Sequence, residues 1–271
     1  MMLDSDGLPL DEVGSWAKEK HERLRRYVDI SRAVRRKFLA KSGAATYVDL
    51  YCGAGRAIVR ESDERIDGSP LAAFKIAKDG GVPFSEIHIA DESEERCRAA
   101  QQRIAKAGGI AKVEIGAADA TSRLIVKKLN PYGLHFVFLD PYNLNDLPFS
   151  VIEAFSGLRY LDMLIHVSVQ DLQRNLDAYS ASKHGPLDRF APGWREGVEL
   201  KQTKIATRAA FVGFWISKIE SLGLSVSQNP ELVTGPIRHQ RLYWLVFVGR
   251  HPLAKEFWDK IRNVSGQGEL L

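Results

Sequence analysis

The stretch Tyr47-Val48-Asp49-Leu50-Tyr51-Cys52-Gly53-Ala54-Gly55-Arg56 joins a short apolar strand to a glycine turn. Gly53 and Gly55 have no Cβ, so the backbone there can bend sharply and approach a ligand within van der Waals distance. Asp49 ends the strand, where its carboxylate can accept a hydrogen bond from a loop amide or a ligand amine. The stretch therefore predicts a site for a nucleotide-like cofactor, with contacts from Asp49, Tyr51, Gly53 and Gly55.

Strand-like and helix-like segments alternate after this stretch. Short apolar runs predict strands at 46–50, 86–90, 112–115, 135–139 and 163–169. Helices are expected between them, at 68–78, 93–107, 117–129 and 149–158. This alternation implies an α/β fold with a doubly wound, Rossmann-like and mostly parallel sheet. Such a sheet binds its ligand at the carboxyl ends of the strands, near the switch point beside the first of them.

The remaining segments are arranged around that sheet. We expect a basic helical N-terminal extension at 1–42 and one domain at 43–271. Within the domain, the polar residues 56–67 are interpreted as a loop or small excursion, and residues 170–202 as a cap or long loop with partial helix. The chain is expected to close with a helix, two strands that form an antiparallel hairpin, and a final helix, at 203–222, 224–233, 242–248 and 252–264.

Composition excludes several classes of protein. The 271 residues are 45% hydrophobic, with a formal net charge of +4, and no segment has the length and apolarity of a membrane span or a signal peptide. The two cysteines, Cys52 and Cys97, lie in unrelated contexts, and the seven histidines are scattered. We therefore expect no disulfide framework, no metal site and no membrane contact, in a soluble protein of the reducing cytoplasm.

The positive charge is concentrated near the N-terminus. Ten basic residues lie between Lys18 and Lys41, against three acidic ones, in a segment with helical spacing of apolar residues. A basic surface of this kind suits a nucleic-acid partner. It also suits a solvated helix face that packs on the domain through Trp16, Leu24 and Val28. The predicted nucleic-acid contacts are Arg25, Arg26, Arg35 and Arg36.

The spacing of the glycines indicates which kind of cofactor the site binds. A dinucleotide site reads G-x-G-x-x-G, whereas Ile58 stands at the third glycine position here. The stretch instead resembles the first motif of class I methyltransferases, which implies S-adenosyl-L-methionine as cofactor. Asp91 resembles the acid that binds the ribose hydroxyls, and Asp119-Ala120 resembles the pair beside the adenine. Either acid alone is equally suited to cap the helix that follows it.

The whole chain also resembles the three-Cys-motif partner proteins of bacteria, a methyltransferase-like family of poorly defined role. This resemblance implies a protein partner from the three-Cys-motif system. The motifs that carry it are Trp16-Ala17-x-x-Lys20-His21-x-x-Leu24, Tyr47-Val48-Asp49-Leu50, Gly68-Ser69-Pro70-Leu71, Phe138-Leu139-Asp140-Pro141-Tyr142 and Tyr243-Trp244-Leu245.

Asp140-Pro141-Tyr142 is the predicted catalytic motif. In methyltransferases acting on the amino group of adenine or cytosine, a loop after the fourth strand reads D/N-P-P-Y/F. Its acid or amide and a proline carbonyl accept hydrogen bonds from the exocyclic amine, and its aromatic ring stacks on the base. This chain has one proline, with Tyr142 at the second proline position and Asn143 at the aromatic one. Cytosine-C5 chemistry is excluded because neither cysteine follows a proline.

Two functional hypotheses follow. The first is an S-adenosylmethionine-dependent methyltransferase that modifies an exocyclic amino group of a nucleic-acid base, with Asp140, Pro141 and Tyr142 as catalytic residues. The second is a catalytically lapsed methyltransferase fold that serves as a binding partner in a two-protein bacterial system. The departure from the D/N-P-P-Y/F pattern is the feature that favours the second.

Overall fold

The computed structural model describes residues 2–200, 203–227, 231–234 and 241–261. Its centre is an eight-stranded sheet in the order β10-β12-β9-β8-β3-β6-β7, with β11 also paired to β12. The bounds of these strands are β3 (Ala45–Asp49), β6 (Glu86–Asp91), β7 (Lys112–Ile115), β8 (Leu134–Leu139), β9 (Leu161–Ser168), β10 (Ser225–Val226), β11 (Glu231–Thr234) and β12 (Arg241–Gly249). β12 runs antiparallel to each of its three neighbours, and the pairings from β9 through β7 are parallel. The predicted Rossmann-like fold class is confirmed.

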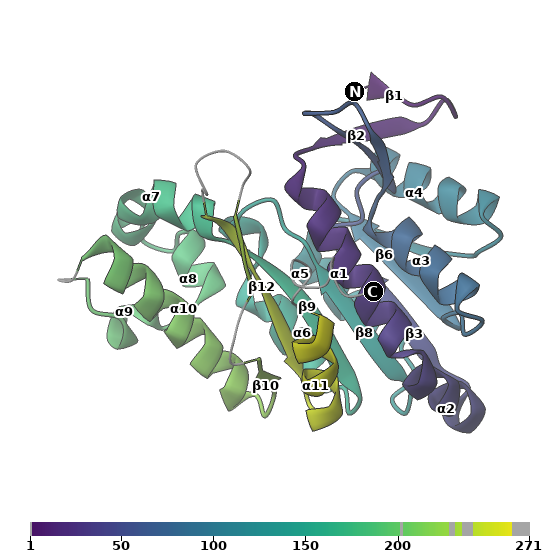
Figure 1. Ribbon diagram of the computed structural model, residues 1–271. Coiled ribbons are helices and arrows are strands. Elements are labelled where there is room, and N and C mark those ends of the chain that lie inside the picture. The colour runs from purple at the N-terminus through teal and green to yellow at the C-terminus, as the bar shows by residue number, and fades with distance from the viewer. Residues whose placement is uncertain (1, 201–202, 228–230, 235–240, 262–271) are drawn as a thin grey trace, which may run out of the picture.

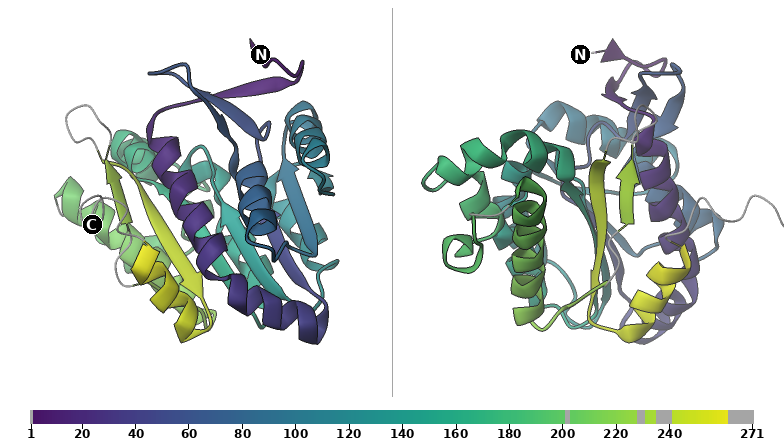
Figure 2. Two further views of the ribbon diagram at one scale, coloured as in Figure 1. Left: turned by 45° about the vertical axis from the view of Figure 1, so that its right-hand side comes forward. Right: turned by 60° about the vertical axis from the view of Figure 1, so that its left-hand side comes forward.

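Helices cover both faces of this sheet (Figures 1 and 2). One apolar cluster joins the sheet to α1 (Trp16–Ile30), α3 (Ser69–Asp79), α4 (Glu94–Lys106) and α11 (Pro252–Ile261). The other joins it to α5 (Ala118–Val126), α6 (Phe149–Ser156), α7 (Val169–Ala181), α8 (Pro186–Phe190), α9 (Trp194–Gly197) and α10 (Lys204–Ser221). The central strand β3 is buried throughout, as expected for a parallel strand covered on both faces.

A second, smaller sheet contradicts one prediction. Its strands follow the order β1-β2-β4-β5, with bounds β1 (Met2–Leu3), β2 (Pro9–Val13), β4 (Arg56–Val59) and β5 (Arg65–Asp67). Residues 56–67 therefore form a small excursion of two paired strands and not a loop. The N-terminal segment is not only helical. The strands are too short to show a periodic pattern, and β2 finds its parallel partner β4 more than forty residues along the chain, with Asp11 opposite Ala57.

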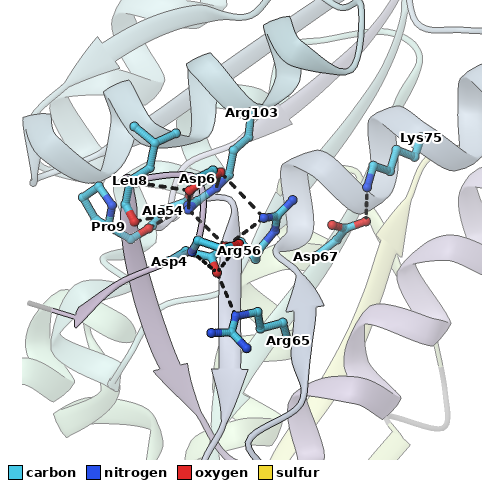
Figure 3. A network of polar contacts seen from close by, with 11 residues as sticks. Asp4, Asp6, Leu8, Pro9, Ala54, Arg56, Arg65, Asp67, Lys75 and Arg103 are labelled. Atoms are coloured by element: carbon cyan, nitrogen blue, oxygen red, sulfur yellow. Dashed lines mark hydrogen bonds and ion pairs between the residues drawn. The ribbon is translucent and has the colours of Figure 1, made fainter.

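A buried arginine holds the N-terminal segment against the glycine loop (Figure 3). Arg103 of α4 is 2% exposed, and its guanidinium donates to the carbonyl oxygens of Pro9 and Ala54, both at 2.7 Å. It also donates to Asp6 at 2.8 Å and 3.0 Å. Asp4 lies beside this group and pairs with Arg56 at 2.7 Å. Residues 4–9 are therefore packed against the glycine loop and α4.

Helix α1 is fixed on the sheet by both apolar and polar contacts. Leu24 and Val28 are fully buried against it, which confirms the predicted packing. The buried hydroxyl of Tyr27 donates to Asp162 of β9 at 2.7 Å. Burial raises the pKa of Asp162 to about 6, and the hydrogen bond from Tyr27 lowers it in part. The basic helix thus crosses the middle of one sheet face.

The segments predicted near the C-terminus are present, but the cap is helical and one predicted strand is two. The cap at 170–202 consists of α7, α8 and α9, held to α10 by the stacked rings of Phe190 and Trp215 at 5.1 Å. The strand predicted at 224–233 is divided into β10 and β11, and residues 228–230 between them lie outside the described residues, as do 201–202 and 262–264. Among the helices described, none is long and apolar enough to cross a bilayer.

Candidate cofactor and acceptor site

A cavity of about 800 Å³ lies at the carboxyl ends of the central strands. This volume is within the usual range for a small-molecule or cofactor site. It brings together most of the residues predicted from the sequence, namely Tyr51, Gly53, Asp91, Asp119, Asp140, Pro141 and Tyr142. We call the end near Gly53, Asp91 and Asp119 the cofactor half, and the end near Asp140 the acceptor half.

The two glycines of the turn differ in what they contact. Gly53 has φ +53° and lines the cavity, and its N–H donates to Oδ2 of Asp91 at 3.2 Å. Gly55 has φ +75° and does not line the cavity. A Cβ on Gly55 would lie 2.9 Å from the Cα of Ala100 in α4. Gly53 therefore serves the ligand space, and Gly55 lets the turn pack against a helix.

Asp49 braces the glycine turn from beneath. It is fully buried and accepts hydrogen bonds from the N–H of Tyr51 at 3.2 Å and the hydroxyl of Tyr47 at 3.0 Å. Burial raises its pKa to about 7, against the effect of hydrogen bonds from Ser69, Tyr47 and Tyr51. The predicted bond to a loop amide is present. The carboxylate itself does not line the cavity, so the structure gives Asp49 no direct contact with a ligand there.

The acids after β6 and β7 are placed differently from one another. Asp91 is half-buried and lines the cavity, and its two oxygens accept from the N–H groups of Ser93 at 2.9 Å and Gly53 at 3.2 Å. It thus makes the local turn expected of a capping residue and also faces the ligand space. Asp119 lies in the first turn of α5 and lines the cavity, whereas Ala120 is exposed and does not.

Asp11 of β2 is a site residue that the sequence analysis missed. Its Oδ2 accepts from the N–H of Ala54 at 2.5 Å, and its Oδ1 pairs with Arg96 at 3.2 Å. Burial raises the pKa of Asp11, while the Ala54 hydrogen bond lowers it. A Cβ on Gly53 would meet this carboxylate at 2.4 Å. No sequence signal marks Asp11, because only the pairing of β2 with β4 places it over the turn.

The acceptor half contains a buried charged cluster around Asp140. Lys20 of α1 reaches both oxygens of Asp140, at 2.5 Å and 2.6 Å, and is itself 8% exposed. His166 of β9 lies with its Nδ1 3.3 Å from Oδ1 of Asp140. Burial alone would raise the pKa of Asp140, but the nearby charge of Lys20 lowers it below the usual value. Asp140 is therefore an ionised carboxylate that already holds a cation.

Pro141, Tyr142 and Tyr243 surround this cluster. Pro141 is buried, and its carbonyl oxygen accepts from Nδ1 of His166 at 3.1 Å. Tyr142 is 92% exposed at the mouth of the cavity. The ring of Tyr243 meets the ring of His166 edge-on at 4.5 Å and lies 5.7 Å from the ammonium of Lys20. Lys20 and Tyr243 both occur in the motifs of the family resemblance, which is the signal that would have marked them.

The cap adds polar side chains at the rim of the acceptor half. Arg174 of α7 is exposed and lines the cavity, and Arg189 of α8 donates to the side-chain oxygen of Asn145 at 3.3 Å. The hydroxyl of Tyr51 donates to the carbonyl oxygen of Asp146, which ties the glycine loop to the same rim. The wall of the cavity therefore carries two guanidinium groups from the cap.

The four arginines predicted to contact nucleic acid do not form one surface. Arg35 is 1% exposed, and its guanidinium donates to Val82 O at 3.1 Å, so the prediction is wrong for this residue. Arg26 pairs with Glu22 at 2.8 Å, and Arg36 is exposed on α2 (Arg32–Ser42). Arg25 is half-buried and lines a separate hollow of about 440 Å³. Helix α2 leads directly into β3, so it lies at the amino ends of the strands (Figure 1). The cavity lies at their carboxyl ends.

The cysteines and histidines form no metal centre in the described part of the chain. Cys52 and Cys97 are both buried and free, although their Sγ atoms are only 3.9 Å apart. They lie in the glycine turn and in a helix, as expected, but their closeness in space was not predicted. The strand order brings the glycine turn against the first turn of α4, so the two thiols pack together.

No protein-family model and no curated protein matches the sequence. Among solved structures, the chain is similar to protein LPL1258 from Legionella pneumophila, with 8% identity, a TM-score of 0.53 and coverage of 90% of this chain and 91% of that one. It is also similar to an O-methyltransferase from Bacillus cereus in complex with SAH, with 14% identity, a TM-score of 0.51 and coverage of 90% and 85%. The fold is therefore the Rossmann-like fold of methyltransferases.

Proposed function

We propose that the protein is an S-adenosylmethionine-dependent methyltransferase. The observation that carries the proposal is the single cavity in which the glycine turn and Asp91 face the same space as Asp140 and Pro141. Methyl transfer needs the donor and the acceptor held together in one such space. The similar B. cereus O-methyltransferase was solved with SAH, which supports the choice of cofactor.

The hydrogen-bonding groups of the cofactor half suit S-adenosylmethionine. Each oxygen of Asp91 accepts one hydrogen bond from the protein, which leaves lone pairs for the ribose hydroxyls. Gly53 lines the cavity beside Asp91, and Asp119 would lie beside the adenine. When bound, S-adenosylmethionine supplies an electrophilic methyl group, and the residues of this half bind and orient it.

We propose an exocyclic amino group of a nucleic-acid base as the methyl acceptor. Asp140 and the Pro141 carbonyl retain lone pairs beyond those used by Lys20 and His166, so they can still accept from an amine. Tyr142 offers an exposed ring at the cavity mouth for stacking on a base. Arg174 and Arg189 lie at the same rim, where a phosphate would be attracted.

The experiment is a thermal melt followed by a transfer assay. S-adenosylmethionine and SAH at a hundredfold excess over Kd should each stabilise the protein by about 2.7 kcal/mol. Asp91→Ala should weaken this stabilisation, whereas Asp140→Ala should keep it. Labelled methyl transfer to adenine- and cytosine-containing RNA and DNA oligonucleotides should be lost in Asp140→Ala. No stabilisation by either compound would contradict the proposal at its first step.

A second candidate is a catalytically lapsed fold that binds a protein partner from the three-Cys-motif system. It is favoured by the ammonium of Lys20, which lies on both oxygens of Asp140 where an acceptor amine would bind. In that case, the melt would show cofactor binding or none, and no oligonucleotide would be methylated. Copurification of the partner with both wild type and Asp140→Ala would then support the second candidate.

A further inference from the structure

His166 stands at the point where β9 reaches the cavity. It lies on the face of β9 that α1 covers, and it lines the cavity beside Asp140 and Pro141. Its side chain is 11% exposed. The ionisable groups that face its ring are Asp140 from the loop after β8, Lys20 from α1 and Tyr243 from β12. The acceptor half therefore contains an imidazole to which the proposed function assigns no role.

The hydrogen bonds of His166 fix which ring nitrogen carries the proton. The carbonyl oxygen of Pro141 can only accept, so Nδ1 at 3.1 Å must donate to it. Asp140 Oδ1, at 3.3 Å from the same nitrogen, favours the same arrangement. Within the described residues, no hydrogen bond engages Nε2. A neutral His166 therefore has its basic lone pair on Nε2.

Burial keeps this imidazole neutral. It lowers the pKa of His166 to about 4, against the opposing effect of Asp140, and Lys20 lowers it further. A histidine whose Nδ1–H is oriented by a carboxylate and a carbonyl, with Nε2 unprotonated, has the arrangement of a general base. Asp140 is less suited to that role, because the Lys20 ammonium already contacts both of its oxygens.

We propose that His166 is a catalytic residue that takes the proton released by the acceptor amine, while Asp140 and Pro141 position its ring. In this step the amine nitrogen forms a bond to the methyl carbon, the bond from that carbon to the sulfonium sulfur breaks, and the sulfur keeps the electron pair. The nitrogen then gives one proton to Nε2 of His166, which becomes an imidazolium beside the carboxylate of Asp140. The inference rests on the proposed function and adds a named proton acceptor to it.

The first test does not depend on activity. Long-range ¹H–¹⁵N spectra of the ¹⁵N-labelled protein, assigned with His166→Asn, report the tautomer of each histidine. At pH 7 we expect His166 to be neutral with its proton on Nδ1, and to remain so down to about pH 5. A proton on Nε2, or an imidazolium at pH 7, would overturn the proposal.

The second test measures transfer from labelled S-adenosylmethionine to the adenine- and cytosine-containing oligonucleotides. Asn places a donor near the Nδ1 position and has no nitrogen at the Nε2 position, so His166→Asn should keep the cofactor-induced thermal shift. Its kcat should fall at least about a hundredfold, and added imidazole should restore part of the loss. A variant rate within threefold of wild type would remove His166 from the chemistry. Lack of transfer by the wild type would remove the proposed function, and this inference with it.

Discussion

In the cofactor half of the cavity, the chain supplies neighbouring groups from short, consecutive strand-to-helix turns. The bond from Gly53 to Asp91 spans 38 positions, which contain the short strands β4 and β5, the helix α3 and the strand β6. In the acceptor half, Lys20 reaches Asp140 across 120 positions, and Tyr243 donates to the carbonyl oxygen of Trp16 across 227. The first half is thus a product of the repeating strand-helix unit, and the second is assembled from both ends of the chain.

This difference in how the two halves are assembled predicts how each responds to substitutions. A change in the cofactor half should act through the turn itself and the helix against which it packs. A change in the acceptor half should act through the docking of α1, because α1 brings Lys20 to the sheet. The exception is the N-terminal strand β2, which places Asp11 and the Arg103 contacts over the cofactor half.

The largest effect is expected for Arg103→Met. This change leaves Asp6 and the carbonyl oxygens of Pro9 and Ala54 without their buried donor. Loss of one partner from a buried ion pair costs about 3–5 kcal/mol of the free energy of unfolding. Urea denaturation of wild type and variant measures the loss. Arg98→Met is the matched control, since Arg98 is exposed on the same helix, and it should change the value by less than about 0.5 kcal/mol.

A smaller effect is expected for alanine at the two glycines. Gly55→Ala combines a positive φ with a clash on the backbone of Ala100, so it should cost about 2–4 kcal/mol. Gly53→Ala also places alanine at a positive φ, but its Cβ meets a side chain, the Asp11 carboxylate, rather than backbone, so it should cost less stability and weaken cofactor binding more. Denaturation curves and the cofactor-induced thermal shift, measured on both variants, test the division of tasks. Equal losses of both quantities would contradict it.

A pH-dependent effect is expected for Asp49→Asn. With its pKa at about 7, the folded protein keeps a proton on Asp49 that the unfolded chain releases near pH 4. Stability should therefore fall as the pH rises from 4 to 7 and then level off. The variant lacks this contribution, so the wild type should lose free energy of unfolding relative to the variant as the pH rises from 4 to 7. Asp162 titrates in both proteins and cancels from the difference. A constant difference would show that Asp49 ionises normally.

The smallest effect concerns the rim of the acceptor half. If Arg174 contacts a phosphate, Arg174→Gln should reduce the slope of log affinity against log salt by about 1 for a single-stranded oligonucleotide. Arg36→Gln, at the amino ends of the strands, is the matched comparison. Oligonucleotide titrations at several salt concentrations show whether the cap or the basic helices contact the phosphates. A reduced slope in Arg36→Gln alone would favour the original prediction for α1 and α2.

The sequence predicted the main sheet closely. β7 has the predicted bounds, and β3, β6, β8 and β9 differ from them by at most two residues. β8 and β9 are the clearest cases, because each is a largely apolar run bounded by polar turns. The same turns identified Gly53, Asp91 and Asp140 as cavity residues. Short strands without such a run were missed, as β4 and β5 show. Charge alone also misled, since Arg35 looks like a surface cation and is a buried hydrogen-bond donor.

By itself, the sequence determined the strand-helix alternation and the glycine turn, because both depend on the local conformation of a few adjacent residues. Only the tertiary structure decided what surrounds Asp140. Lys20, His166 and Tyr243 come from three elements, and a strand or helix pattern gives no distance between them. The reason is physical: the packing of α1 across the sheet and the insertion of antiparallel β12 beside β9 bring these groups together. Burial at that junction then sets their charges, since it lowers the pKa of His166 to about 4 and requires a partner for Lys20.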